Sequence, residues 1–109
     1  MKMVVAIMHG DDAGASIEAL ADRGIPSTRL DTSGGFLHKG NTTVLCGVAD
    51  GQVDTVMAVL REHSKSRTEF LNPMPPIVEP GDMYVPYPVE VEVGGAVVFV
   101  LDVERFEKI

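Results

Sequence analysis

Cysteine, basic residues and long apolar runs are all scarce in this sequence. Cys46 is the single cysteine among 109 residues, which excludes an intrachain disulfide and fits a reducing compartment. There are 9 Lys and Arg residues against 16 Asp and Glu, a formal net charge of −7, whereas polymeric nucleic acid requires a basic face. No apolar run approaches the roughly 18 residues of a membrane helix, and the N-terminal stretch lacks the pattern of a signal peptide. We therefore expect a cytoplasmic protein that neither inserts into a membrane nor binds polymeric nucleic acid.

The length and composition are those of one globular domain over residues 1–109, with 45% apolar and 23% charged residues. The apolar run at 2–8 predicts a strand that is buried on both faces. Asp11 and Asp12 follow as predicted capping residues, and apolar residues at helical spacing continue to Gly24. The chain therefore begins with a strand and a helix.

Two further strands and a second helix follow. Alternation over 27–33 predicts a strand, and the mostly apolar run at 42–48 predicts another, so the two should form a hairpin. Asp50 begins a helix with one apolar face, which runs to about Ser64.

The last third of the sequence reads as a long loop and a hairpin. Residues 65–88 show no period and hold 6 of the 7 prolines, so we expect a long Pro-rich loop. The segment VEVEV at 89–93, the Gly94-Gly95 pair and the apolar run at 96–103 predict a hairpin. Alternate valines of its first strand should face the core.

This order of elements is typical of an α+β, ferredoxin-like fold. Such a fold has an antiparallel sheet with two helices on one face, here with an extra C-terminal hairpin strand. Residues 3–8, 44–48 and 96–101 are apolar at nearly every position, so the second face of the sheet is apolar as well. Two explanations are open: the chain associates with copies of itself, or the loop at 65–88 folds beneath the sheet.

Residue types that carry catalysis or bind metal ions are not grouped in the sequence. Cys46 lies inside an apolar strand, which indicates a core residue rather than a nucleophile. His9, His38 and His63 are scattered, with no ligand at metal-binding spacing. We therefore expect no enzymatic activity, no catalytic residue, no metal ion and no cofactor.

The turn in "TSGGFLHKGNTTVLCGV", residues 32–48, carries a large apolar side chain that a polar turn does not need. Backbone N–H groups at Gly34 and Gly35 suit phosphate oxygens, and Phe36 suits stacking on a base. The Asn41 amide suits an adenine edge. These parts indicate a nucleotide site, with a plain solvated hairpin as the alternative.

Three segments, "MKMVVAI", "GGFLHKGNTTVLCGV" and "PYPVEVEVGGAVVFVLDVERF", resemble the PII-like cyclic di-AMP receptors, a family of bacterial signal-transduction proteins. The resemblance extends over the whole chain, with a short loop at 34–41 and a long one at 65–88. It implies a homotrimer of ferredoxin-like subunits that binds cyclic di-AMP between neighbouring subunits. It also implies that loops report the ligand to a downstream protein.

The resemblance implies seven ligand-binding positions, which are Thr28, Gly35, Phe36, Leu37, Asn41, Gly47 and Phe99. The chain departs from the family where Gly24 replaces an Asn, Pro26 replaces a basic residue and Lys108 replaces a Gln that holds the base. Loss of an Arg–phosphate contact removes on the order of 1.5–3 kcal/mol. Arg29 does not replace it, because its side chain points to the other face from Thr28.

Two functions are compatible with these residues. The first is a non-enzymatic signalling homotrimer that senses cyclic di-AMP or a related adenine nucleotide. The second is a protein-interaction trimer that has lost or changed its nucleotide ligand, a reading motivated by Pro26 and Lys108.

We predict that Phe36→Ala leaves the melting temperature almost unchanged and weakens nucleotide binding by about 1–3 kcal/mol, because an exposed stacking residue buries little area in the free protein. Calorimetry and thermal unfolding of this one variant check both statements. If Phe36 is a core residue turned inward, stability falls instead by about 3–5 kcal/mol. A large loss of stability with normal affinity would contradict the stacking role.

Overall fold

The computed structural model describes residues 1–31, 40–71 and 88–109. In chain order the elements are β1 (Lys2–His9), α1 (Gly10–Asp22), β2 (Thr28–Asp31), β3 (Asn41–Val48), a short 3-10 helix η1 (Asp50–Gln52), α2 (Val53–Ser64), β4 (Arg67–Leu71), β5 (Val89–Val93) and β6 (Ala96–Asp102).

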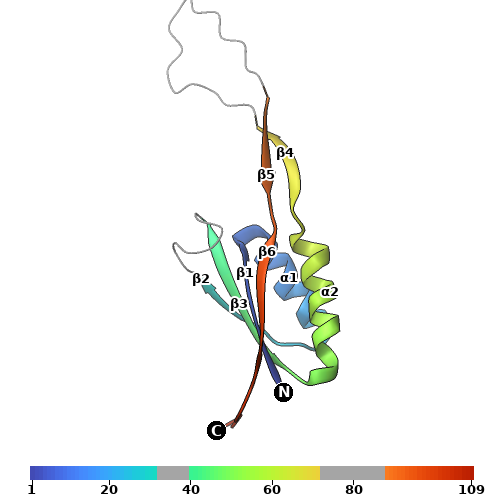
Figure 1. Ribbon diagram of the computed structural model, residues 1–109, viewed down its shortest axis with the longest axis vertical. Coiled ribbons are helices and arrows are strands. Elements are labelled where there is room, and N and C mark those ends of the chain that lie inside the picture. The colour runs from blue at the N-terminus through green and yellow to red at the C-terminus, as the bar shows by residue number, and fades with distance from the viewer. Residues whose placement is uncertain (32–39, 72–87) are drawn as a thin grey trace, which may run out of the picture.

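Four strands form the main sheet, in the order β2-β3-β1-β6. Every neighbouring pair in it is antiparallel. Both helices lie against one face of this sheet (Figure 1). The α+β, ferredoxin-like fold expected from the sequence is therefore confirmed, with β6 as the edge strand next to β1.

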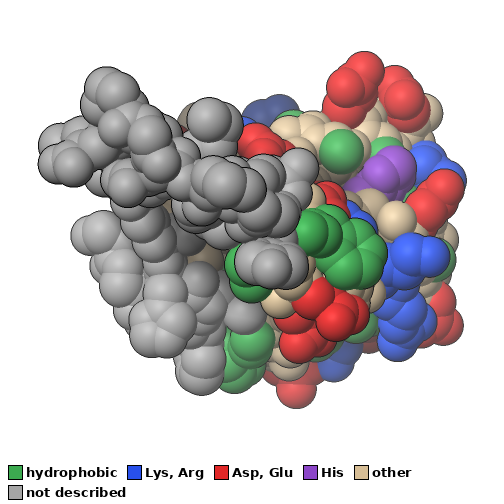
Figure 2. Space-filling model, turned by 90° about the horizontal axis from the view of Figure 1, so that it is seen from above, with side chains coloured by type: hydrophobic (Ala, Val, Ile, Leu, Met, Phe, Trp, Pro, Cys, Tyr) green, Lys and Arg blue, Asp and Glu red, His purple; other side chains and the backbone are tan. Residues whose placement is uncertain are grey.

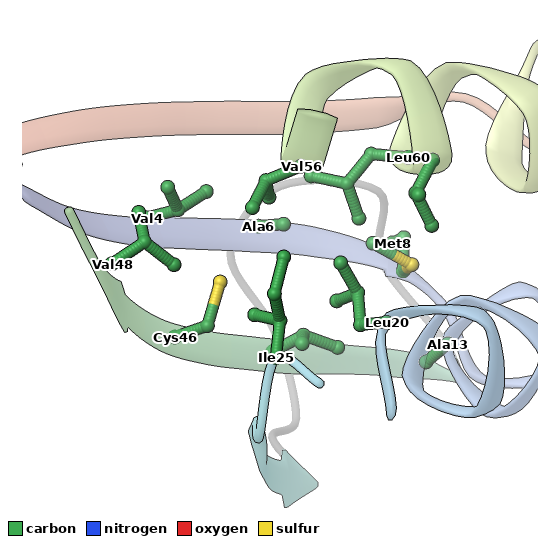
Figure 3. Packing of buried hydrophobic residues seen from close by; sticks show 12 residues of the cluster. Val4, Ala6, Met8, Ala13, Leu20, Ile25, Cys46, Val48, Val56 and Leu60 are labelled. Carbon is green, nitrogen blue, oxygen red and sulfur yellow. The ribbon is translucent and has the colours of Figure 1, made fainter. Parts of the chain in front are cut away.

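The core lies between the helices and one face of the sheet (Figure 3). Alternate residues of β1 and β3 point to this side, because side chains on a strand alternate between the two faces. Val4 pairs with Cys46 and Ala6 with Val44 in the register of the two strands. Leu20 of α1 is fully buried against this side of the sheet. The remaining buried apolar residues are Met8, Ala13, Ile25, Val48, Val56, Val59 and Leu60.

Cys46 is a core residue, as its apolar surroundings in the sequence predicted. The residue is 3% exposed. Burial raises the pKa of its thiol, so the reactive thiolate is disfavoured.

The start of α1 differs from the prediction that Asp11 and Asp12 cap it. His9 is the N-cap residue, and its Nδ1 accepts a hydrogen bond of 3.4 Å from the Asp11 N–H. Asp12 lies inside the first turn and is 6% exposed. A buried carboxylate needs a partner, and Asp12 finds one in Arg67, which is 55 residues away in the sequence.

The pairing of the C-terminal strands also differs from the prediction. Val89–Val93 does not form a hairpin with 96–102: β5 pairs with β4, and β6 pairs with β1 in the main sheet. The expected loop at 65–88 thus contains a strand, β4, that its lack of periodicity concealed. Residues 72–87 of that loop lie outside the described part.

We call the β4–β5 ribbon the arm. It projects from one end of the main sheet (Figure 1). Its outward position explains why the valines of β5 do not face the core, with Val89 47% exposed. Gly94 and Gly95, at φ +81° and +86°, form the corner between arm and sheet rather than a hairpin turn.

The second face of the main sheet is apolar, and no described helix or strand covers it. Its members from β1 and β3 other than Gly47 are half-buried by their neighbours, while most of those nearest the sheet edges are more open. Leu30 is 45%, Phe99 42% and Leu101 50% exposed. The residues on this face are Met3, Val5, Ile7, Thr28, Leu30, Thr43, Leu45, Gly47, Val97, Phe99 and Leu101.

We predict that Leu20→Ala lowers the free energy of unfolding by about 2–5 kcal/mol, because Leu20 is fully buried and leaves a cavity. Urea unfolding followed by circular dichroism measures the change. Phe70→Ala is the control, since Phe70 lies on the arm and is 70% exposed. Equal losses in the two variants would contradict the placement of the core.

Candidate functional site

Of the seven predicted ligand residues, the structure describes four, and these lie in three separate regions. Thr28 and Gly47 lie close together at one end of the second face. Asn41 lies at the opposite end of β3, and Phe99 lies on the edge strand β6. Gly35, Phe36 and Leu37 lie outside the described residues.

Thr28 and Gly47 line one pocket of about 420 Å³, which we call the Thr28 pocket. Strand register explains their meeting, because Thr28 pairs with Leu45 across β2 and β3, two residues from Gly47. The lining residues are Met1, Met3, Pro26, Ser27, Thr28, Leu45, Cys46, Gly47, Val103 and Phe106. A volume in this range suits a small organic ligand or part of one.

Gly47 leaves the floor of this pocket open. A Cβ at this position would have no neighbour within 4 Å, so packing within the chain does not require a glycine. A glycine inside a strand weakens the strand and often marks a place where a ligand or another backbone approaches closely. The space beside Gly47 is therefore open to a ligand or to a second chain.

None of the side chains lining the Thr28 pocket carries a formal charge at neutral pH. The nearest candidate, Arg29, is directed to the helix side of the sheet, as its alternation with Thr28 predicted. Its Nε donates to the Asp31 carboxylate at 3.1 Å, and its Nη2 lies 3.5 Å from the Thr42 hydroxyl. The hydrogen bonds from Arg29 and then from Thr42 lower the pKa of Asp31, so the carboxylate stays ionised and holds Arg29 away from the pocket.

Phe99 lies across the sheet from Thr28. The pairs Thr28–Leu45, Leu45–Val5 and Val5–Phe99 form one row over four strands. Three strand spacings separate the ends of this row, about 14 Å at about 4.8 Å per spacing. One subunit alone therefore does not bring Phe99 to the Thr28 pocket.

Asn41 lies about 20 Å from Gly47 along β3, at about 3.3 Å per residue. It is 3% exposed. With His9, Glu92, Val93 and Gly94 it lines a cavity of about 200 Å³ where the arm meets the sheet. This polar end of β3 is joined to the start of α1 by a backbone hydrogen bond of 2.9 Å from Gly10 to Gly40.

An ion pair fixes the arm at the same junction. Arg67 of β4 donates to both carboxylate oxygens of Asp12, at 3.1 and 3.4 Å. The Asp12 side chain is 8% exposed, whereas that of Arg67 is 41% exposed. The hydrogen bond to Asp12 raises the pKa of Arg67, so the guanidinium stays charged. Seen from above, this end of the molecule displays acidic and basic side chains close to one another (Figure 2).

Within residues 1–31, 40–71 and 88–109, no three His, Cys, Asp or Glu side chains are grouped to hold a metal ion. Among the helices in these ranges, none is long and apolar enough to cross a membrane.

Two lining residues of the Thr28 pocket, Ser27 and Phe106, were not anticipated from the sequence. Phe106 follows β6 in a mostly polar segment, and an aromatic side chain there was the only available signal. Ser27 gave none, because a serine before a strand is common in any turn. Their importance depends on the fold, which brings positions 27 and 106 to one place.

A family model described as "Cyclic-di-AMP receptor" matches residues 1–109, the whole chain. Among solved structures, the chain is similar to a functionally unknown protein from Pediococcus pentosaceus ATCC 25745. The two sequences are 36% identical, and the TM-score is 0.79 over 99% of this chain and 96% of that chain.

We predict that Arg67→Ala accelerates amide hydrogen exchange in β4 and β5 several-fold, because the arm loses its ionic contact with α1. Exchange in β1 and β3 should stay near the wild-type rate. Arg61→Ala is the matched control, since Arg61 is exposed and forms no ion pair with any residue in the described ranges. An arm with unchanged protection would show that other contacts hold it.

Proposed function

The chain belongs to the cyclic-di-AMP receptor family, and from this premise we propose that it is a non-enzymatic cytoplasmic receptor that binds cyclic di-AMP as a homotrimer. The ligand binds at the subunit interfaces, and its binding is passed through the loops to a downstream protein. The proposed contacts are Thr28, Gly35, Phe36, Leu37, Asn41, Gly47 and Phe99.

The apolar second face supports self-association. Two helices cover one side of the sheet, and the other side exposes Leu30, Phe99 and Leu101 to about half of their full extent. Exposed apolar surface spread over four strands is typical of an interface between chains. Packing these faces around a common axis removes them from water in all three copies.

The position of Phe99 supports a ligand site shared between subunits, and this is the observation that carries the proposal. Within one chain Thr28 and Phe99 lie at opposite edges of the same face. In a cyclic trimer each interface joins two different surfaces, so the β2 edge of one subunit meets the β6 edge of the next. The two halves of the site then come together only in the assembly.

One observation favours the second function, a protein-interaction trimer with a lost or changed ligand. Pro26 lines the Thr28 pocket, and no charged side chain does. A phosphate that relatives hold with a basic side chain near this point finds no such partner in the pocket. The exposed Phe70 on the arm would then belong to the surface that contacts the partner protein.

Calorimetry with cyclic di-AMP, AMP, ADP and ATP, together with sedimentation, separates the two functions. The receptor function predicts one cyclic di-AMP per subunit interface and a particle of about three subunits. Absence of heat and of thermal stabilisation with all four nucleotides would overturn it and leave the protein-interaction trimer. A monomer at micromolar concentration would overturn both.

We predict that Gly47→Val weakens cyclic di-AMP binding at least about tenfold, because the new side chain fills the pocket floor. The melting temperature should stay the same or rise, since valine favours a strand and a Cβ meets nothing there. Gly51→Val is the control: a Cβ at Gly51 also meets nothing, but this glycine lies in η1 outside the pocket. Unchanged affinity in Gly47→Val would exclude the pocket as part of the site.

A further inference from the structure

A groove of about 340 Å³ lies between the end of α2 and the start of β6, near the base of the arm. It shares no lining residue with the Thr28 pocket. Ala96 and Val98 form its β6 wall, and they face the helices because they alternate with the second-face residues Val97 and Phe99. The proposed trimer packs through the second face, so the groove lies on the other side of the sheet from that interface.

The floor of this groove is apolar, and Ser64 at its edge has its hydroxyl and carbonyl already engaged. Met57 and Leu60 of α2 line the groove together with the two β6 residues. The Ser64 hydroxyl donates to the Leu60 carbonyl, and the Ser64 carbonyl accepts from the Gly95 N–H. An occupant therefore meets mainly apolar surface between α2 and β6.

Two cationic side chains, Arg61 and Lys65, also line the groove, and no acidic side chain does. They are four residues apart at the end of α2, so they lie about one helical turn apart on the same side. Neither forms an ion pair within residues 1–31, 40–71 and 88–109, although Asp and Glu outnumber Lys and Arg by 16 to 9 in the chain. Two cations beside an apolar floor favour an acidic occupant that also carries apolar side chains.

We propose that this groove binds an extended acidic segment of the downstream protein, with carboxylates on Arg61 and Lys65 and apolar side chains against β6. The inference rests on the proposed receptor function, which supplies the downstream protein. Alternate side chains of an extended segment are about 6.6 Å apart, close to the spacing of residues one helical turn apart. If acidic and apolar residues alternate, one side of the segment faces the cations and the other faces the apolar wall. A basic segment would be repelled.

The probe is a fluorescein-labelled decapeptide of alternating glutamate and leucine, titrated into the full chain and followed by fluorescence anisotropy. A decapeptide with lysine in place of glutamate is the control and should not bind. Raising the salt from about 0.05 M to about 0.5 M should weaken binding of the glutamate peptide about threefold to tenfold, because the charges at the rim are exposed.

Variants test the two parts of the groove separately. Arg61→Glu should weaken peptide binding about tenfold, because attraction at the rim becomes repulsion. Arg23→Glu is the matched control: Arg23 is also exposed, lies at the end of α1 outside the groove, and should be replaceable with a change of no more than about twofold. Met57→Ala should weaken binding about threefold to tenfold, whereas Met57→Leu keeps the apolar surface and should stay within about twofold.

Nuclear magnetic resonance of methyl-labelled methionines locates the peptide. Met57 is the one methionine among the described residues that line the groove, and Met3 lines the Thr28 pocket. The peptide should shift the Met57 methyl signal and leave that of Met3 unchanged. Cyclic di-AMP should shift the Met3 signal and should bind Arg61→Glu as tightly as the wild type.

Failure of this inference and failure of the proposed function give different results. Normal binding of cyclic di-AMP without binding of the glutamate peptide overturns the docking site and leaves the receptor function standing. Equal peptide binding by Arg61→Glu and Arg23→Glu, or binding that leaves the Met57 signal unmoved, has the same consequence. A wild type that does not bind cyclic di-AMP overturns the receptor function, and with it the assignment of the groove to a receptor's downstream protein.

Discussion

The arrangement of this molecule depends on a sheet whose central strands are apolar on both faces. In β1 and β3 one set of alternate residues packs under the helices, and the other set faces away from them. Two helices cover only one face of a four-stranded sheet. In a single chain, one face of the sheet is therefore covered by helices, and the other face remains an exposed apolar surface.

The same constraint accounts for the division of the candidate site. A side chain on the second face is available to a ligand only because no helix covers it. Thr28 and Phe99 share that face but lie on opposite edges of the sheet. In the proposed trimer, burial of this face and completion of the site would occur together, since both use the same exposed strands.

The sequence predicted those features that depend on near neighbours. The apolar runs at 2–8 and 42–48 led to the correct strands, and Cys46 was correctly placed in the core. The resemblance identified Thr28 and Gly47, which do share a pocket. Gly94-Gly95 between two apolar runs was read as a hairpin turn, and that was wrong. Two glycines allow a turn or a corner equally well, and the choice depends on where distant strands find partners.

Other features were not predictable because they depend on contacts between distant segments. Asp12 has the sequence position of a capping residue, and only the placement of Arg67 makes it one partner of an ion pair. Ser27 and Phe106 line the same pocket only because the fold brings these two distant positions together. In each case the residue type was compatible with several roles, and tertiary structure selected one.

The arm forms its own two-stranded sheet, while β6 completes the main sheet independently of it. A two-stranded ribbon is marginal by itself, so this arm needs its anchor at Asp12 and the tight corner. At that corner a Cβ on Gly94 would lie 2.7 Å from both the Arg67 Nη1 and the Lys65 carbonyl oxygen. The glycine corner and the ion pair thus fix the base of the arm, and substitutions farther out along β4 and β5 leave the strand pairing of the main sheet unchanged.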